Sequence, residues 1–230
     1  MTIWTMQNQD ENLSHAVSMV NVGANHEYYD QNFVIPTKTD LKNEYLILVN
    51  KFHYLGKDFV PDDLVSVKNW YAYGENEIRE EVYRQFIAMF NDAQKEDLKL
   101  IINSSYRTYE RQESLWNGYK RSQGQEWADS VAARAGYSEH QTGLTLDITT
   151  DGEYTTMDKF DQSDEFKWLS KNAHKYGFIL RYPKGKEDIT GYDYESWHYR
   201  YVGVETATKI YNLGITFDEY YAYYKDEIEG

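Results

Sequence analysis

The chain has 230 residues, and its 38 acidic and 24 basic side chains give a formal net charge of −14 at pH 7. This charge argues against nucleic acid or an anionic membrane surface as the main partner, because both are bound by clustered lysine and arginine. A hydrophobic fraction of 41% is enough to build a folded core. The absence of cysteine excludes disulfides, thiolate zinc sites, iron–sulfur clusters and cysteine nucleophiles.

The N-terminal part differs from the rest in composition. Residues 1–44 are polar, rich in Asn, Gln and Asp and weakly periodic, so we predict an extension or stalk before one domain over residues 45–230. No segment approaches the roughly 18 apolar residues of a membrane helix. The first residues lack the basic and apolar regions of a signal peptide. We therefore expect either a cytoplasmic protein or one whose export segment is absent from this chain.

In chain order, the first predicted elements are a strand, a turn and a helix, over residues 45–49, 59–64 and 75–94. The helix is predicted from apolar residues that recur every three or four positions, namely Ile78, Val82, Phe86, Ile87, Phe90 and Ala93. A strand over 98–102 and a helix over 109–121 follow, with Thr108 as the helix N-cap. A short helix is predicted over 126–134.

The second half of the chain also mixes short strands and helices. Strands are predicted over 144–148, 178–182 and 197–202, and helices over 164–176, 205–212 and 217–228. Ser163 and Gly177 are suited to cap the first of these helices. Because the strands and helices lack βαβ regularity, the pattern predicts an α+β domain with an antiparallel sheet flanked by helices.

Common catalytic motifs are missing, because the chain contains no GxSxG, SxxK, HExxH or GxxxxGK[ST]. One segment nevertheless brings chemical groups together: His140 and Asp147 lie seven residues apart, with Gly143 between them to let the chain turn. In the strand that follows, Thr145 and Asp147 point to one face, whereas the apolar residues Leu144, Leu146 and Ile148 point to the other. The apolar set can therefore enter the core and leave Asp147 beside His140.

A second segment, Glu195-Ser-Trp-His198, enters the last predicted strand. Two histidines and one aspartate make a suitable ligand set for a zinc ion with a fourth position open to water. Such chemistry needs a carboxylate base, and Glu195 is the natural candidate. Positions i and i+3 of a regular strand point to opposite faces, so we expect Glu195 in the loop before the strand and His198 within it.

These segments resemble the VanY-type D-alanyl-D-alanine carboxypeptidases, within the zinc metallopeptidase group that also holds lysostaphin-like enzymes and hedgehog domains. The signature SxHxxGxxxD is found at residues 138–147, and the signature ExWH at 195–198. A third signature, SxYR with Gln five residues later, is found at residues 104–107 and 112. The resemblance covers residues 45–225 and implies the hedgehog/D-Ala-D-Ala-peptidase-like fold.

The resemblance also implies a role for individual residues. The zinc ligands, one ion per chain, would be His140, Asp147 and His198, and the catalytic base would be Glu195. Arg107 would hold a substrate carboxylate or carbonyl, for which a planar guanidinium is well suited. Substrate contacts carry over to Gln112 and Ser138, although Ser138 could order its loop and Gln112 could be a solvated helix residue. Trp197 could wall the pocket or pack in the core.

The implied function is a zinc carboxypeptidase that removes the C-terminal D-alanine from peptidoglycan stem peptides, in cell-wall remodelling or glycopeptide resistance. Two alternatives use the same site, a D-Ala-D-Ala dipeptidase and an endopeptidase on cross-links. A third is a non-catalytic wall-binding module. We expect a monomer outside the membrane or in the cell envelope, with a cytoplasmic dipeptidase as the alternative.

Overall fold

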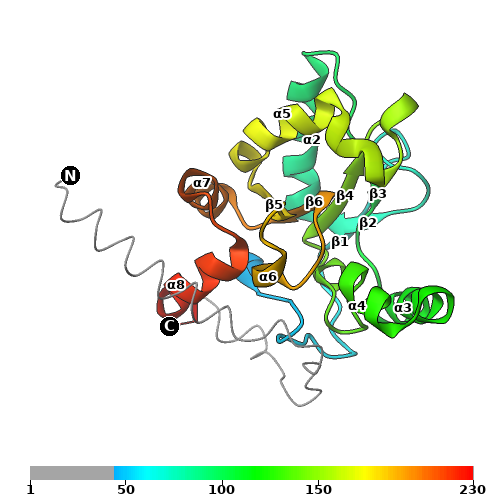
Figure 1. Ribbon diagram of the computed structural model, residues 1–230. Helices are drawn as coiled ribbons and strands as arrows, with labels where there is room; N and C mark the ends of the chain where they lie inside the picture. The colour runs from blue at the N-terminus through cyan, green and yellow to red at the C-terminus, as the bar shows by residue number, and fades with distance from the viewer. Residues whose placement is uncertain (1–43, 230) are drawn as a thin grey trace.

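The computed structural model describes residues 44–229, so the predicted extension lies outside the described residues except for Glu44. Its central element is an antiparallel sheet with the strand order β3-β4-β6-β5. The strands are β3 (Ile101–Ser104), β4 (Thr145–Thr149), β5 (Phe178–Tyr182) and β6 (Glu195–Tyr201). Helices flank this sheet (Figure 1), which confirms the predicted α+β class.

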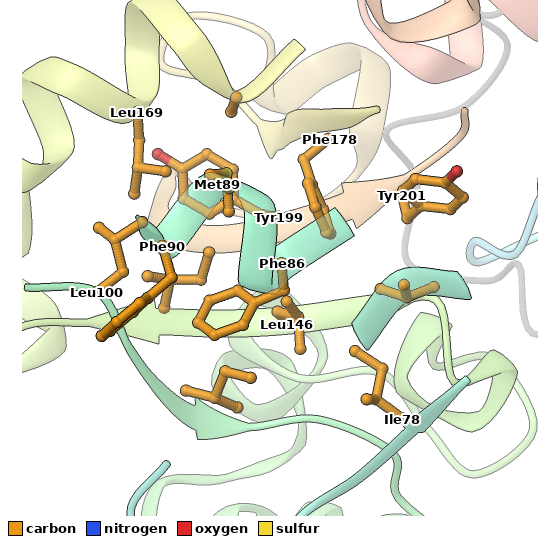
Figure 2. Packing of buried hydrophobic residues seen from close by; sticks show 14 of the residues in the cluster. Ile78, Phe86, Met89, Phe90, Leu100, Leu146, Leu169, Phe178, Tyr199 and Tyr201 are labelled. Carbon is orange, nitrogen blue, oxygen red and sulfur yellow. The ribbon is translucent and has the colours of Figure 1, made fainter. Parts of the chain in front are cut away.

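One face of the sheet packs against helices α2 (Glu80–Gln94) and α5 (Asp164–Asn172). Phe86, Met89 and Phe90 of α2 pack in one buried cluster with side chains of β4, β5 and β6 (Figure 2). Leu146 of β4 and Tyr199 of β6 belong to this cluster and are fully buried. Burial of these apolar side chains is the main force that holds the sheet to the helices, and the predicted apolar face of β4 is confirmed.

The other face of the sheet carries polar side chains beside a smaller apolar cluster. That cluster joins the segment 46–48 to Ile179 of β5 and to helices α7 (Val204–Leu213) and α8 (Phe217–Glu229). Because side chains alternate along a strand, the neighbours of the apolar residues on β4, β5 and β6 point to this second face. Asp147, Arg181, His198 and Arg200 all lie on this face and are buried.

Helices α3 (Tyr109–Gln123) and α4 (Gln125–Val131) lie together at one end of the molecule, away from α2 and α5 (Figure 1). Thr108 caps α3 by accepting a hydrogen bond from the backbone N–H of Arg111, as predicted. The remaining elements are short: β1 (Leu64–Ser66) pairs with β2 (Glu77–Arg79), and α6 (Glu187–Thr190) precedes β6. Short 3₁₀ segments include Glu44–Leu46 and Glu139–Thr142. Among the described residues, no helix is long and apolar enough to cross a membrane.

Two sequence predictions about elements are wrong, and the strand predicted over 98–102 begins only at Ile101. Residues 45–49 form no strand, but begin with a 3₁₀ turn and continue as a buried irregular segment. The backbone carbonyls of Tyr45 and Ile47 are satisfied by the Arg200 side chain instead of a neighbouring strand. The helix predicted from residue 75 begins only at Glu80, because residues 77–79 pair with β1. The short apolar run 45–49 is compatible with a strand or an irregular buried segment, and Ile78 alone is compatible with a helix or a strand.

Candidate active site

The three predicted metal ligands come together on the polar face of the sheet. Asp147 of β4 and His198 of β6 are directly paired across the two strands, and such side chains stand side by side on one face. His140 lies in the 3₁₀ turn before β4. One donor atom from each of the three residues lies within 4.8 Å of the others, and all three side chains are buried.

The turn that carries His140 depends on Gly143. Gly143 adopts a left-handed conformation with φ of 66°, and a Cβ atom here would lie 2.9 Å from Cγ of Arg79 and 3.0 Å from Cδ2 of Leu64. Glycine alone combines this conformation with this space at low cost. The predicted turn between His140 and Asp147 is therefore confirmed.

Hydrogen bonds fix the orientation of both imidazole rings. Nδ1 of His140 lies 2.6 Å from the carbonyl oxygen of Ser105, so Nδ1 donates and Nε2 faces the other ligands. Nε2 of His198 lies 3.3 Å from Oε2 of Glu139, so Nε2 donates and Nδ1 points inward. A buried carbonyl thus orients one histidine, and a buried carboxylate orients the other.

The donor atoms fit a metal ion. Nε2 of His140 and Oδ1 of Asp147 are buried 3.3 Å apart, and neither has a hydrogen-bond partner among the described residues. Burial lowers the pKa of His140 to about 4. Burial raises the pKa of Asp147, but the histidines and Arg107 lower it by more, to about 2. A neutral imidazole and an ionised carboxylate are the states that ligate zinc.

His198 lies among carboxylates. Burial lowers its pKa, but Glu139, Glu195 and Asp147 raise it by more, to about 9. The negative field that favours a proton on His198 also favours a divalent cation in its place. Two imidazole nitrogens and one carboxylate oxygen in such a field form a suitable site for one zinc ion.

Glu195 lies beside the ligands, but not where the sequence pattern places it. It is the first residue of β6, not a loop residue, and its Oε2 is 3.1 Å from Nδ1 of His198. The β5–β6 pairing is irregular: Leu180 pairs with Tyr199, but Tyr182 pairs with Glu195. This irregularity changes the alternation of side chains along β6, so that Glu195 and His198, three positions apart, reach the same site. Burial raises the pKa of Glu195, which suits proton transfer near neutral pH.

Arg107 follows β3 and faces Oδ2 of Asp147, whereas the two histidines face Oδ1 of the same carboxylate. Its Nη2 is 3.4 Å from Oδ2 of Asp147, and its Nη1 donates to Oε1 of Gln112 at 2.8 Å. Nε of Arg107 is buried with no hydrogen-bond partner among the described residues. Gln112 in turn donates from Nε2 to the carbonyl oxygen of Ala133 at 2.7 Å. The guanidinium is therefore held in place and keeps a free donor.

The two remaining predicted residues both line the cleft. Oγ of Ser138 accepts a hydrogen bond from the backbone N–H of His140 at 3.3 Å, so this hydroxyl orders the 3₁₀ turn. Trp197 is half-buried and also packs against the main hydrophobic cluster. Each of them has a structural contact as well as a position at the cleft.

All eight predicted residues line one cleft of about 910 Å³. The cleft continues from the metal ligands past Arg107 to helices α3 and α4. At that end Tyr119 and Trp127 form an edge-to-face pair, with ring centroids 5.6 Å apart. They are 41% and 43% exposed. An amphipathic aromatic pair at the rim of a cleft is suited to contact an extended ligand.

Sequence reasoning missed the charged residues beneath the ligands. Glu139 is buried and bonds to Nε of Arg181 at 2.8 Å and Nη1 of Arg200 at 2.9 Å. Arg181 and Arg200 are fully buried. Their position inside the strands 178–182 and 197–202, whose other residues are apolar or aromatic apart from His198, was the available sign, because a charged residue is buried only when it is paired.

Comparison with known proteins assigns the family. Residues 75–204, which contain all eight predicted site residues, match the model of the family described as VanY, D-alanyl-D-alanine carboxypeptidase. The chain therefore belongs to the VanY family, as its motifs predict. It is 40% identical over 181 residues to the putative carboxypeptidase YodJ of Bacillus subtilis, which covers 76% of this chain. The chain spans 66% of the length of YodJ.

Two solved structures share the fold. The LdcB LD-carboxypeptidase is 39% identical with a TM-score of 0.72, and the match covers 78% of this chain and 87% of LdcB. A vancomycin-resistance D,D-pentapeptidase VanY variant, solved in complex with Zn(II), is 34% identical with a TM-score of 0.66. That match covers 77% of this chain and 99% of the variant. The predicted fold family is thus confirmed.

Proposed function

We propose that this protein is a zinc-dependent carboxypeptidase that removes the C-terminal D-alanine from peptidoglycan stem peptides. The observation that carries the proposal is the buried group of His140, Asp147 and His198, which shares one cleft with Glu195 and Arg107. Zinc ligands, a base and a substrate anchor are the groups that hydrolysis of a terminal amide requires.

In this proposal His140, Asp147 and His198 hold one zinc ion, which supplies a Lewis acid and lowers the pKa of water to about 7. Glu195 takes a proton on its carboxylate from the water that attacks the amide carbonyl. It then delivers this proton to the nitrogen of the leaving D-alanine as the C–N bond breaks. The products are a shortened peptide with a new carboxylate and free D-alanine.

Arg107 holds the free C-terminal carboxylate of the substrate, which makes the enzyme an exopeptidase. Its unpartnered Nε supports this role, because a guanidinium donates to a carboxylate through two parallel N–H groups. Gln112 positions Arg107 through its hydrogen bond to Nη1. Ser138 and Trp197 line the same cleft and would border the bound peptide.

The size of the cleft favours a stem peptide over a free dipeptide. A volume of about 910 Å³ is near the upper end for ligand sites, and it extends beyond the scissile end to the aromatic pair Tyr119 and Trp127. The similar proteins include one described as an LD-carboxypeptidase and one described as a D,D-pentapeptidase. The test therefore compares an L,D bond in a tetrapeptide stem with a D,D bond in a pentapeptide stem. Free D-Ala-D-Ala and cross-linked peptides are included as the alternative substrates.

The cellular setting is part of the proposal. Stem peptides lie outside the cytoplasmic membrane, so we place the enzyme in the cell envelope or outside the cell. Every group that the proposed chemistry uses comes from one chain, and we therefore expect an active monomer. Gel filtration with light scattering tests the oligomeric state.

Mass spectrometry of products from tri-, tetra- and pentapeptide stems tests the activity, with and without a chelator. We expect loss of one D-alanine from the tetra- or pentapeptide, abolition by the chelator and recovery on addition of zinc. Faster cleavage of free D-Ala-D-Ala would support the dipeptidase, and cleavage inside cross-links the endopeptidase. Binding of stems without any cleavage would support the non-catalytic module.

A further inference from the structure

A chain of buried charges links the metal ligand His198 to the C-terminal helix. It comprises Glu139, Arg181, Arg200 and Asp218, which are all almost completely buried. Arg181 lies between two carboxylates, bonding through Nε to Glu139 and through Nη1 and Nη2 to Asp218. Burying charged groups costs more than burying apolar ones of similar size, so a function for this cluster is expected.

The cluster meets the metal site at one atom pair. Oε2 of Glu139 accepts from Nε2 of His198 at 3.3 Å, while Oε1 accepts from Nε of Arg181 and Nη1 of Arg200. The two oxygens of Glu139 thus have separate partners. A carboxylate that accepts from the outer nitrogen of a metal-binding histidine fixes its tautomer and its ring orientation. Here it leaves Nδ1 directed at Asp147 and Glu195.

Elements far apart in the sequence hold the arginines. Arg200 also donates from Nη2 to the carbonyl oxygens of Tyr45 and Ile47. Asp218 of α8 accepts from Arg181 and also from Nδ2 of Asn50 at 2.9 Å. Asp218 and the segment 45–50 both lie outside residues 75–204, the part of the chain that matches the family model.

We propose that Glu139 is a positioning residue that orients His198 for zinc, and that Asp218 of α8 supports it by holding Arg181 in place. The inference rests on the metal site of the proposed function, but not on the identity of the substrate. Segment 45–50 and helix α8, which flank the matched region, would thus support metal binding indirectly, because they complete the charge network around Glu139 and His198.

The sequence contains a matched control for Asp218. The next residue, Glu219, is also buried and also belongs to α8. It pairs with Lys186 at 3.2 Å and accepts a hydrogen bond from the backbone N–H of Thr216. Among the described residues, no hydrogen bond connects Glu219 to Arg181 or Glu139. Glu219→Gln and Asp218→Asn each remove one buried charge from the same helix turn, but only the second touches the network.

The test measures the zinc dissociation constant of the purified full chain by competition with a chromophoric chelator. Glu139→Gln should weaken zinc binding by about 10- to 100-fold, the usual effect of losing such a partner. The amide has a single acceptor oxygen, which can serve either His198 or the two arginines, and its NH₂ group then faces the N–H donors on the other side. Asp218→Asn should weaken binding by about three- to tenfold, and Glu219→Gln by less than about twofold. The visible spectrum of Co²⁺ bound in place of zinc should change in Glu139→Gln and Asp218→Asn only.

Circular dichroism and urea unfolding establish that each variant is folded under the binding conditions. If Glu139→Gln does not fold, the pair Asp218→Asn and Glu219→Gln carries the test alone. If folded Glu139→Gln and Asp218→Asn had the same zinc affinity and Co²⁺ spectrum as the wild type, the proposal would be overturned. Equal weakening by Asp218→Asn and Glu219→Gln would also overturn it. Because zinc binding is measured without a substrate, failure of the carboxypeptidase assignment would leave this result unaffected.

Discussion

The two ends of the cleft are built differently. At one end, paired strands place Asp147 and His198, the adjoining 3₁₀ turn places His140, and these residues are at most 7% exposed. At the other end, Tyr119 and Trp127 extend from α3 and α4 and are 41% and 43% exposed. The sheet that carries the ligands packs on the main hydrophobic cluster, to which no residue of α3 or α4 contributes.

This difference separates two tasks. In the proposed reaction, bond cleavage needs atoms held within fractions of an ångström, and the metal end would supply them from a packed sheet and a buried charge network. Contact with the rest of a substrate tolerates movement, and the α3–α4 end supplies it from exposed side chains. Substitutions at the metal end should therefore act on kcat, and substitutions at the α3–α4 end on KM.

The largest effect is expected for Glu195→Gln. The amide cannot take a proton from water, so kcat should fall by about 10²- to 10⁴-fold. Stopped assays with mass spectrometry measure kcat, and metal analysis measures the zinc content of the same sample. Loss of zinc together with activity would assign Glu195 to metal binding and not to proton transfer.

Arg107→Lys should have the next largest effect. A lysine keeps the charge but loses the fork of donors, and a lost charge-assisted hydrogen bond lowers kcat/KM by about 10- to 100-fold. A peptide with an amidated C-terminus should already be a poor substrate of the wild type, and Arg107→Lys should add little to that loss. If both peptides lose rate equally on substitution, Arg107 does not hold the terminal carboxylate.

Trp127→Ala should have a smaller effect and should affect only long substrates. Loss of an aromatic contact should raise KM for stem pentapeptides by about two- to tenfold and leave kcat unchanged. A short acylated D-Ala-D-Ala peptide should show no change. Trp70→Ala is the control, because Trp70 is 71% exposed and does not line the cleft. A lower kcat in Trp127→Ala would show that the two ends are not independent.

The smallest effect concerns acid stability at the metal end. Burial raises the pKa of Glu139, but Arg181 and Arg200 lower it by more, so that it lies well below its usual value of 4.5. The contribution of ionised Glu139 to the stability of the fold is therefore complete above about pH 4.5, and it is lost as the pH falls toward the lower folded-state pKa of Glu139. Urea unfolding of metal-free protein from about pH 6 to pH 3 should show a steeper loss of stability in the wild type than in Glu139→Gln. Parallel curves would contradict this assignment.

Local patterns predicted a large part of the fold and the site. Strand β5 and the caps Thr108 and Ser163 follow from short-range sequence rules and are as predicted. The grouping of His140, Asp147 and His198 follows from spaced motifs. Residues 45–49 could not be predicted, because their conformation depends on Arg200, which lies about 150 residues away.

Long-range pairing also explains the other misses. The position of Glu195 in β6 depends on an irregular pairing with β5, which no local pattern in residues 195–202 encodes. Glu139 is adjacent to His140 in the sequence, but its role depends on Arg181 and Arg200, which come from two later strands. Sequence periodicity describes single elements, whereas these roles arise when the elements meet.

The direct pairing of Asp147 with His198 has a further consequence. A slip of one residue between β4 and β6 would turn one of these side chains to the opposite face of the sheet, and the donor atoms could no longer meet. Asp147 and His198 would hold a metal ion from two strands that lie about 50 residues apart in the sequence, and the bound ion would stabilise this register. Zinc uptake during refolding would therefore report the moment at which this chain acquires its correct strand register.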